Sequence, residues 1–233
     1  MLDNYISIDL ETTGLNPKLD KIIEIGAVKV VEGQIVDTYS ALVNPGRRLE
    51  ERITELTGIT DADLEGKPYI EEILPEVMAF LGDMPLLGHS VLFDYSFLKK
   101  AAVNQKLTFE KQAVDTLRIA RRYLTELEHR SLDYLCDYYH IPHHAHRALA
   151  DAQATHILYG KLAELFYKED EVLFRPQPLH FQVKRDTPIT KPQKERLYRL
   201  LAQHNITLET DVEQLTRSEA SRFTDKILAK YGR

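Results

Sequence analysis

The sequence predicts an α/β fold, with a central mixed sheet flanked by helices, followed by a small helical module. Three observations predict this arrangement. β-branched and apolar residues dominate three segments near the N-terminus, 2–10, 21–31 and 34–43. Strand-like and helix-like segments then alternate from position 85 to position 166. Finally, a Pro-Gln-Pro sequence at 176–178 separates this body from a basic tail.

The first three strands are expected to form an antiparallel meander. The dipeptide Glu32-Gly33 joins the second to the third, and a connection this short favours a hairpin. A loop around Asn16-Pro17 joins the first to the second, and Asn44-Pro45-Gly46 ends the meander.

Apolar spacing places the other elements of the body. The expected helices are 50–56, 68–81, 93–103, 117–123, 131–139 and 148–166. The expected short strands are 85–89 and 113–116. A meander followed by such alternation indicates a mixed sheet with helices on its faces.

Three parts of the chain are expected: a body at 1–170, a linker at 171–189 and a small basic helical module at 190–233. The net charge of −6 hides an asymmetry between them. Residues 176–233 hold 11 Lys+Arg and 7 Asp+Glu, which leaves 19 and 29 for residues 1–175. An acidic body with a basic tail suggests two modules with different roles.

Five basic residues of the last predicted helix are candidates for contacts to phosphates. A solvated charged face is the alternative interpretation. These residues are Arg217, Arg222, Lys226, Lys230 and Arg233.

Composition narrows the class of protein. Hydrophobic residues make up 43% and charged residues 28% of the chain, which is ordinary for a globular protein. No apolar run approaches the ~20 residues that cross a bilayer, and no secretory signal is visible. Cys136 is the only cysteine, which excludes an internal disulfide and a cysteine zinc cluster. We expect a cytoplasmic protein with no membrane partner.

The first strand carries two carboxylates, Asp9 and Glu11, within the sequence ISIDLETTG. Residues i and i+2 of a strand point to the same face, so both acids project together. Like charges this close are costly unless a cation lies between them, and oxygen ligands suit Mg²⁺ or Mn²⁺. The alternative is that the acids merely mark where the strand leaves the core.

Two later segments add acids in apolar surroundings. Asp94 follows the short strand 85–89, and Asp151 lies in the first turns of the long helix, with His146 one turn before it. Taken singly, Asp151 is as well explained by a favourable position near a helix N-terminus, and His146 by exposure to solvent. Together, four carboxylates and a histidine suit two divalent cations about 4 Å apart that act on a phosphodiester.

With these residues, the sequence resembles the DEDDh family of 3′→5′ exonucleases, which includes the proofreading subunits and domains of bacterial replicative polymerases. The segments IDLETTGLNP, GHSVLFD and HRALADA resemble its three motifs in order, in separation and in the His-x-x-x-x-Asp spacing. The resemblance covers about residues 1–168. It implies a ribonuclease-H-like fold with a five-stranded mixed sheet flanked by helices.

The resemblance also implies a role for each residue. Asp9 would bridge two divalent cations, Mg²⁺ or Mn²⁺. Glu11 and Asp151 would complete one metal site, and Asp94 would hold the second ion through water. His146 would be the general base that takes a proton from the attacking water, a task that suits a side chain with an unperturbed pKa of about 6.5.

Four further positions match the family's substrate contacts: Thr12, Thr13, Thr57 and His89. Thr57 departs from the pattern, because many relatives have His-Gly-Ile where this chain has Thr57-Gly58-Ile59. The alternative for Thr57-Gly58 is the end of a helix.

The expected function is metal-dependent removal of nucleoside 5′-monophosphates from DNA 3′ ends, in proofreading or repair. RNA trimming by the same chemistry is one alternative, because no motif reveals how the 2′-hydroxyl is treated. A nucleic-acid-binding protein that keeps the fold without catalysis is another. The expected partner is a DNA 3′ end, with a DNA polymerase as a second partner to consider.

Overall fold

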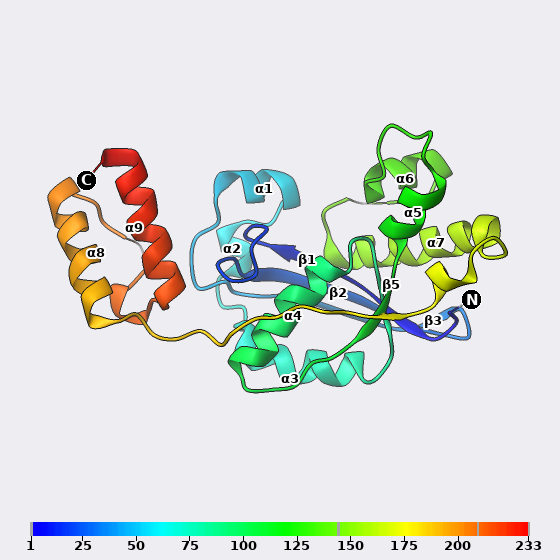
Figure 1. Ribbon diagram of the computed structural model, residues 1–233, viewed down its shortest axis with the longest axis horizontal. Helices are drawn as coiled ribbons and strands as arrows, with labels where there is room; N and C mark the ends of the chain where they lie inside the picture. Colours follow the sequence, from blue (N-terminus) through cyan, green and yellow to red (C-terminus); the bar gives the residue numbers. More distant parts are fainter. Residues whose placement is uncertain (1, 144, 209, 233) are drawn as a thin grey trace.

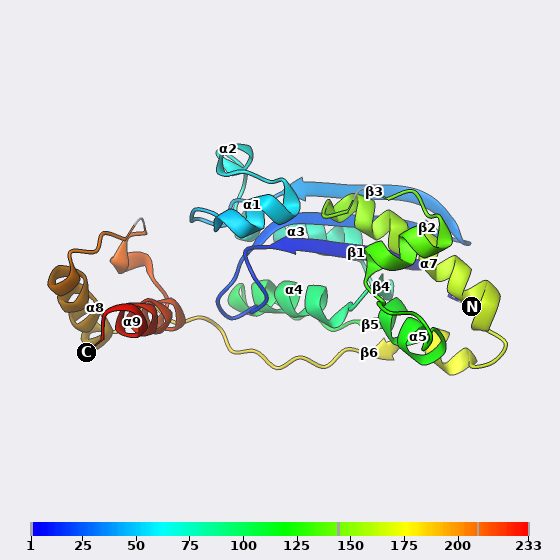
Figure 2. The same ribbon diagram turned by 90° about the horizontal axis from the view of Figure 1, so that it is seen from above.

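The computed structural model of the protein describes residues 2–143, 145–208 and 210–232. A mixed sheet forms the centre of the body, helices cover both of its faces, and a separate helical module stands at the C-terminal end (Figures 1 and 2). The predicted α/β fold is therefore confirmed.

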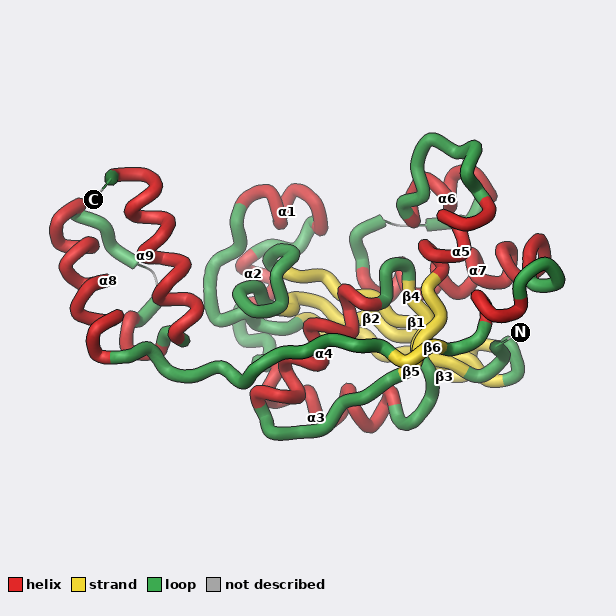
Figure 3. Tube along the Cα trace, in the orientation of Figure 1, coloured by secondary structure: helices red, strands yellow, loops and turns green. Residues whose placement is uncertain are grey.

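Six described strands form the sheet, in the order β3-β2-β1-β4-β5-β6 (Figure 3). β1, β2 and β3 form the predicted antiparallel meander, β4 and β5 run parallel to β1, and β6 is antiparallel to β5. The strands are β1 Tyr5–Thr12, β2 Ile22–Val31, β3 Gln34–Leu42, β4 Leu86–Gly88, β5 Gln112–Asp115 and β6 Gln177–Pro178.

The predicted helices are present, with ends that differ by a few residues. One further short helix, α2, begins with a capping box made by Thr60 and Asp63. The α-helices are α1 Glu51–Thr57, α2 Asp61–Leu64, α3 Ile70–Leu81, α4 Leu92–Asn104, α5 Thr116–Tyr123, α6 Leu132–Tyr139, α7 Ala148–Phe166, α8 Lys191–His204 and α9 Arg217–Tyr231. The 3₁₀-helices are Glu171–Phe174 and Val212–Gln214.

Alternation along β1 divides the body into two cores. Ile6, Ile8 and Leu10 are buried in the core that contains the buried faces of α3 and α4. Tyr5 belongs to the other core, with buried residues of α5, α6 and α7. Because side chains alternate along a strand, the odd-numbered positions of β1 face α7.

The segment 171–189, expected to be a linker, contributes to the body. Phe174 is buried in the core on the α7 side, and β6 pairs with the edge strand β5. The sheet therefore has a sixth strand beyond the five that were expected. Residues 179–187 then run alongside α4 towards the C-terminal module (Figure 1).

The C-terminal module has a small core of its own, to which both helices and the segment between them contribute residues. Capping boxes begin α8 at Thr190 and α9 at Thr216. The buried core residues are Ile189, Leu197, Leu200, Leu201, Val212, Leu215, Ala220 and Ile227. Throughout the described ranges, no helix has the length and apolarity needed to cross a membrane.

Candidate metal centre

The structure brings three of the predicted carboxylates together. Asp9 and Glu11 project from β1 and Asp151 from the first turn of α7. One carboxylate oxygen from each lies within 4.8 Å of the others. The Ser7 hydroxyl, on the same face of β1, donates to the Ala152 carbonyl at 2.7 Å and so ties the strand to the start of α7. Oxygen atoms from two elements thus converge as a divalent cation requires.

Asp94 reaches the same strand from α4. β4 pairs with β1 only at Ile6 and Ser7, so further along β1 the backbone on that side has no strand partner. The Asp94 carboxylate takes the place of a strand partner there, because it accepts a hydrogen bond from the Leu10 N–H at 3.0 Å. Asp94 is only 3% exposed, and its charge raises the pKa of Asp9. It therefore belongs to the same group of acids.

Burial and mutual repulsion make the charged forms of these acids costly. Burial, followed by the charges of Asp94, Asp151 and Glu11, raises the pKa of Asp9 well above its usual range. Burial and the Asp151 charge raise the pKa of Glu11 to about 8. Burial also raises the pKa of Asp94 and of Asp151. A divalent cation between them would offset this repulsion, so the donor set fits a hard metal ion.

These shifts predict how stability depends on pH and metal. An acid whose pKa is raised by folding stabilises the fold below its unfolded pKa, and this stabilisation is lost as the pH rises through the folded pKa. The metal-free protein should therefore lose stability between about pH 4.5 and pH 8, the range set by Glu11. Mn²⁺ should raise the melting temperature more at pH 8 than at pH 5.5, because protons compete with the metal.

Differential scanning fluorimetry with and without Mn²⁺ measures this effect. The Asp9→Asn variant is the control, in which both the pH-dependent loss and the response to metal should shrink. An equal response to Mn²⁺ at both pH values would contradict the assignment of these acids as ligands.

Two histidines lie near the acids, and the sequence singled out only one. His143 Nε2 contacts Asp151, and its Nδ1 lies 3.5 Å from Asp133. The predicted residue, His146, is 40% exposed at the side chain, with Nε2 3.7 Å from Asp133. Among the described contacts, His143 rather than His146 touches a predicted metal ligand. Asp133, His143 and Asp151 also form a second group that can hold a metal ion.

His146 nevertheless lies near the same acids. Asp133 links it to His143, and its charge acts on Asp151. Its backbone has a φ of 64°, a left-handed conformation that non-glycine residues rarely adopt. Strained backbone of this kind is often found at functional sites. No spacing rule marks His143, whose contact depends on the path of the loop before α7.

Two residues of β2 position α7, and the sequence analysis missed both. The strand register sets Gly26 opposite Asp9 and Glu24 opposite Glu11. Glu24, 2% exposed, accepts hydrogen bonds from Arg147 Nη2 at 2.9 Å and from the Ala148 N–H at 3.0 Å. This carboxylate therefore satisfies the first backbone donor of α7 and anchors the helix that carries Asp151.

Gly26 lets α7 lie directly on the sheet. A Cβ atom at this position would come within 2.1 Å of the Ala148 carbonyl carbon. The signal available in the sequence was an acid and a glycine inside the apolar run KIIEIGAVKVV. A glycine in a strand often marks a close backbone approach.

Gly26→Ala should displace the start of α7. We expect a loss of about 1–3 kcal/mol in unfolding free energy from overpacking. The nuclease activity expected from the sequence should fall about 100-fold, because a displacement of Asp151 of about 1 Å misplaces a group that needs accurate geometry. The matched control is Gly160→Ala in the same helix, where the added Cβ meets nothing within 4 Å. A Gly26→Ala protein as stable and active as the control would refute this account.

The hydroxyl groups of Thr12 and Thr13 take part in the loop that follows β1. Thr12 donates to the Gly14 carbonyl at 2.7 Å. The Thr13 hydroxyl accepts from the Lys21 N–H at 3.0 Å and from Arg47 Nη2 at 2.9 Å. Both side chains are buried, so a substrate contact through them remains a prediction.

Thr57 and His89 are also engaged within the fold. The Thr57 hydroxyl donates to the Ile53 carbonyl at 2.8 Å at the end of α1. His89 lies 2.9 Å from the Thr116 hydroxyl through Nδ1 and 2.7 Å from the Arg130 carbonyl through Nε2. Burial lowers the pKa of His89. The structure does not bring these two residues into the acidic cluster, and their substrate contacts stay predictions.

Comparison with known families identifies the class of protein. Residues 6–159 match the family described as Exonuclease, RNase_T. This region is more than half of the chain and contains all four predicted carboxylates and His146. The chain therefore belongs to the Exonuclease family, and the resemblance drawn from the three motifs is confirmed. The expected class of enzyme, an exonuclease, is that of this family.

Similar proteins are components of DNA polymerase III. The DNA polymerase III subunit epsilon of Aquifex aeolicus is 38% identical over 167 residues, which cover 70% of this chain and 83% of that protein. The DNA polymerase III PolC-type of Thermotoga maritima is 42% identical over 168 residues, 70% of this chain and 12% of that protein. The DNA polymerase III PolC-type of Halalkalibacterium halodurans is 32% identical over 247 residues, which cover 100% of this chain and 17% of that protein. The chain thus spans less than a fifth of these PolC-type relatives.

Solved structures agree with the fold. Exonuclease X in complex with 5′ overhanging duplex DNA is 27% identical, with a TM-score of 0.57 over 70% of this chain and 92% of that chain. A structure of exonuclease I has a TM-score of 0.64 at 19% identity, over 74% of this chain and 42% of that one, a likeness in fold alone. The predicted ribonuclease-H-like architecture is confirmed.

Proposed function

We propose that this protein removes nucleoside 5′-monophosphates from DNA 3′ ends by metal-dependent hydrolysis. The observation that carries the proposal is the convergence of Asp9, Glu11 and Asp151 within 4.8 Å in an exonuclease fold. Their raised pKa values fit a site built for cations. DNA as substrate is supported by the similarity to DNA polymerase III chains and to an exonuclease solved with DNA.

Four carboxylates would hold two divalent cations, Mg²⁺ or Mn²⁺. Asp9 lies in one group with Glu11 and Asp151, and the charges of Asp94, Asp151 and Glu11 all raise its pKa. In this role Asp9 would help to hold both ions, Glu11 and Asp151 would help to hold one of them, and Asp94 would help to hold the second. Bound there, the ions would polarise the phosphodiester and stabilise charge on the leaving 3′-oxygen.

His146 would accept the proton of the attacking water. Its side chain is 40% exposed in the loop before α7, and in this role it would turn from Asp133 towards the substrate. Hydrogen bonds of catalytic groups are often long before the substrate binds. Glu24 and Gly26 would act indirectly, because they fix the start of α7 and therefore the position of Asp151.

Release of mononucleotides from 3′-labelled oligonucleotides tests this function directly. The assay compares single-stranded DNA and RNA of the same sequence, with Mg²⁺ or Mn²⁺ and with EDTA. We expect metal-dependent release from DNA. Faster release from RNA would favour the trimming alternative, and binding without turnover in the presence of metal would favour the non-catalytic alternative.

The relatives also suggest a partner. The matched parts of the PolC-type chains belong to polymerases, which supports a DNA polymerase as the partner and proofreading as the role. A cytoplasmic location, expected from the sequence, stays a prediction.

A further inference from the structure

A basic groove of about 1050 Å³ lies outside the acidic cluster. Its walls are the loop between β1 and β2, the second half of α4 and the extended segment 179–187. Five lining residues are basic and two are acidic, against a body in which acids outnumber bases. The basic residues are Lys18, Lys99, Lys100, Lys184 and Arg185, and the acids are Glu110 and Asp186.

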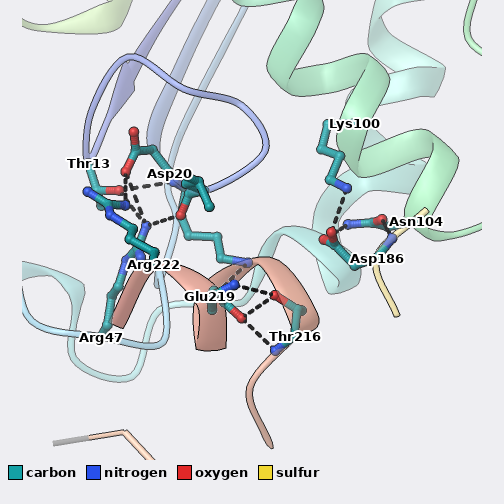
Figure 4. Close-up of polar contacts among 11 residues, drawn as sticks. Thr13, Asp20, Arg47, Lys100, Asn104, Asp186, Thr216, Glu219 and Arg222 are labelled. Carbon is teal, nitrogen blue, oxygen red and sulfur yellow. Dashed lines mark hydrogen bonds and ion pairs between the residues drawn. The ribbon is translucent and has the colours of Figure 1, made fainter. Parts of the chain in front are cut away.

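Helix α4 holds the extended segment in a fixed place (Figure 4). Lys100, 7% exposed, donates to the Lys184 carbonyl at 2.8 Å and to the Asp186 carboxylate at 2.6 Å. Asn104 donates to Asp186 at 2.9 Å and accepts from the Asp186 N–H at 2.9 Å. These partly buried contacts order the backbone at Lys184 and Asp186, and the side chains of Lys184 and Arg185 are exposed.

The two acids of the groove are already neutralised. Glu110 contacts Lys99, and Asp186 contacts Lys100. Across the described residues, no ion pair is formed by Lys18, Lys184 or Arg185. The groove therefore presents three cations without anionic partners, which attract a polyanion.

Two elements of the chain connect the groove with the acidic cluster. The loop that carries Lys18 begins directly after the strand of Asp9 and Glu11. Helix α4 carries Asp94 in its first turn and Lys99 further along. The half-buried aromatic ring of Phe181 also lines the groove, and such rings stack on bases or sugars of single strands.

The C-terminal module docks beside this groove. Arg222 donates to Asp20 at 2.9 Å (Figure 4). Lys226 donates to Glu50 at 3.4 Å. Ser218, at the start of α9, lines the groove. Two of the five tail residues that were candidates for phosphate contacts therefore pair with acids of the body instead.

Two other tail candidates add no described contact to the groove. Lys230 lies over the Tyr231 ring at 5.2 Å, and Arg233 lies outside the described residues. Among the described residues that line the groove, the basic side chains without an ion pair are those of Lys18, Lys184 and Arg185.

We propose that this groove binds the sugar–phosphate backbone of the strand whose 3′ end is hydrolysed. Lys18, Lys184 and Arg185 contact phosphates upstream of the terminal nucleotide, and the linker thereby becomes part of the substrate site. The proposal rests on the proposed function, since it concerns the same strand. It assigns a task to the segment that joins the body to the tail.

The double variant Lys184→Ala/Arg185→Ala tests the groove, with Lys161→Ala/Lys168→Ala near the end of α7 as a control that removes the same charge. Binding of labelled single-stranded DNA and RNA is measured by fluorescence anisotropy in EDTA over a range of salt concentrations. Turnover with Mn²⁺ is measured on a long oligonucleotide and on a dinucleotide, which has no phosphodiester upstream of the bond that is cleaved.

We expect about tenfold weaker binding of DNA by the groove variant, and a salt slope smaller by about 1.4, since each phosphate contact to a single strand contributes about 0.7. KM for the long oligonucleotide should rise while kcat and dinucleotide hydrolysis stay the same. Equal losses for DNA and RNA would show that the groove reads the phosphate backbone alone, whereas a loss for DNA only would show that it also senses the sugar.

Binding and KM equal to those of the control variant, in an active wild-type enzyme, would overturn the groove proposal. An inactive wild type would instead overturn the proposed function. A loss of dinucleotide hydrolysis in the groove variant would also contradict the proposal, because it would place the effect at the acidic cluster.

Discussion

Asp9→Asn should lower nucleotide release by at least about 1000-fold, because metal ions supply several kcal/mol of transition-state stabilisation and each 1.36 kcal/mol is a factor of ten. Asp9 is the residue on which the charges of Asp94, Asp151 and Glu11 all act. The amide keeps the shape of the side chain and removes the charge that would serve both cations. Without metal, the same change should raise the melting temperature, because it relieves repulsion among buried acids.

These opposite effects separate a functional role from a structural one. A destabilised protein would lose activity and melting temperature together, whereas Asp9→Asn should lose only activity. The control is Asp37→Asn on the exposed strand β3, which should leave both quantities unchanged. More than a tenth of wild-type activity in the Asp9→Asn protein would contradict the two-metal account.

His146→Ala should reduce kcat by about 100- to 10,000-fold with little change in KM, the range typical for loss of a general base. This prediction distinguishes between two histidines, because His143 and not His146 touches Asp151 in the structure. We infer that the contact between His143 and Asp151 is made only in the metal-free protein. The imidazole contacts a carboxylate oxygen that would bind the cation, so His143→Ala should change kcat by less than about fivefold.

The two variants are compared by steady-state kinetics over a range of Mn²⁺ concentrations. For His143→Ala we expect the Mn²⁺ concentration at half-maximal activity to fall, since Asp151 no longer has a competing partner. His146→Ala should leave that concentration unchanged. If instead His143→Ala is the inactive variant and His146→Ala retains kcat, the general base has been assigned to the wrong residue.

Regular patterns made much of the site predictable. The two-residue spacing of Asp9 and Glu11 sets them on one face of β1, and helical spacing sets Asp151 at the start of α7. Asp94 converges on them because its helix follows the strand next to β1. Each of these placements depends on local geometry and strand order, which the sequence encodes directly.

Features that depend on irregular backbone were missed. β6 has two residues and forms only because residues 177–178 return to the edge of the sheet, so no periodicity reveals it. The contact of His143 follows from the path of the loop before α7. The role of Gly26 can be recognised only when the structure shows how close it lies to the backbone of Ala148. The exact end of the body was unpredictable for the same reason.

The most direct measurement of the central claim is the anomalous scattering of Mn²⁺ in crystals of this protein. The account predicts two peaks about 4 Å apart, one among Asp9, Glu11 and Asp151 and one between Asp9 and Asp94. A single peak between Asp133 and His143, or no peak at these carboxylates at saturating Mn²⁺, would contradict it.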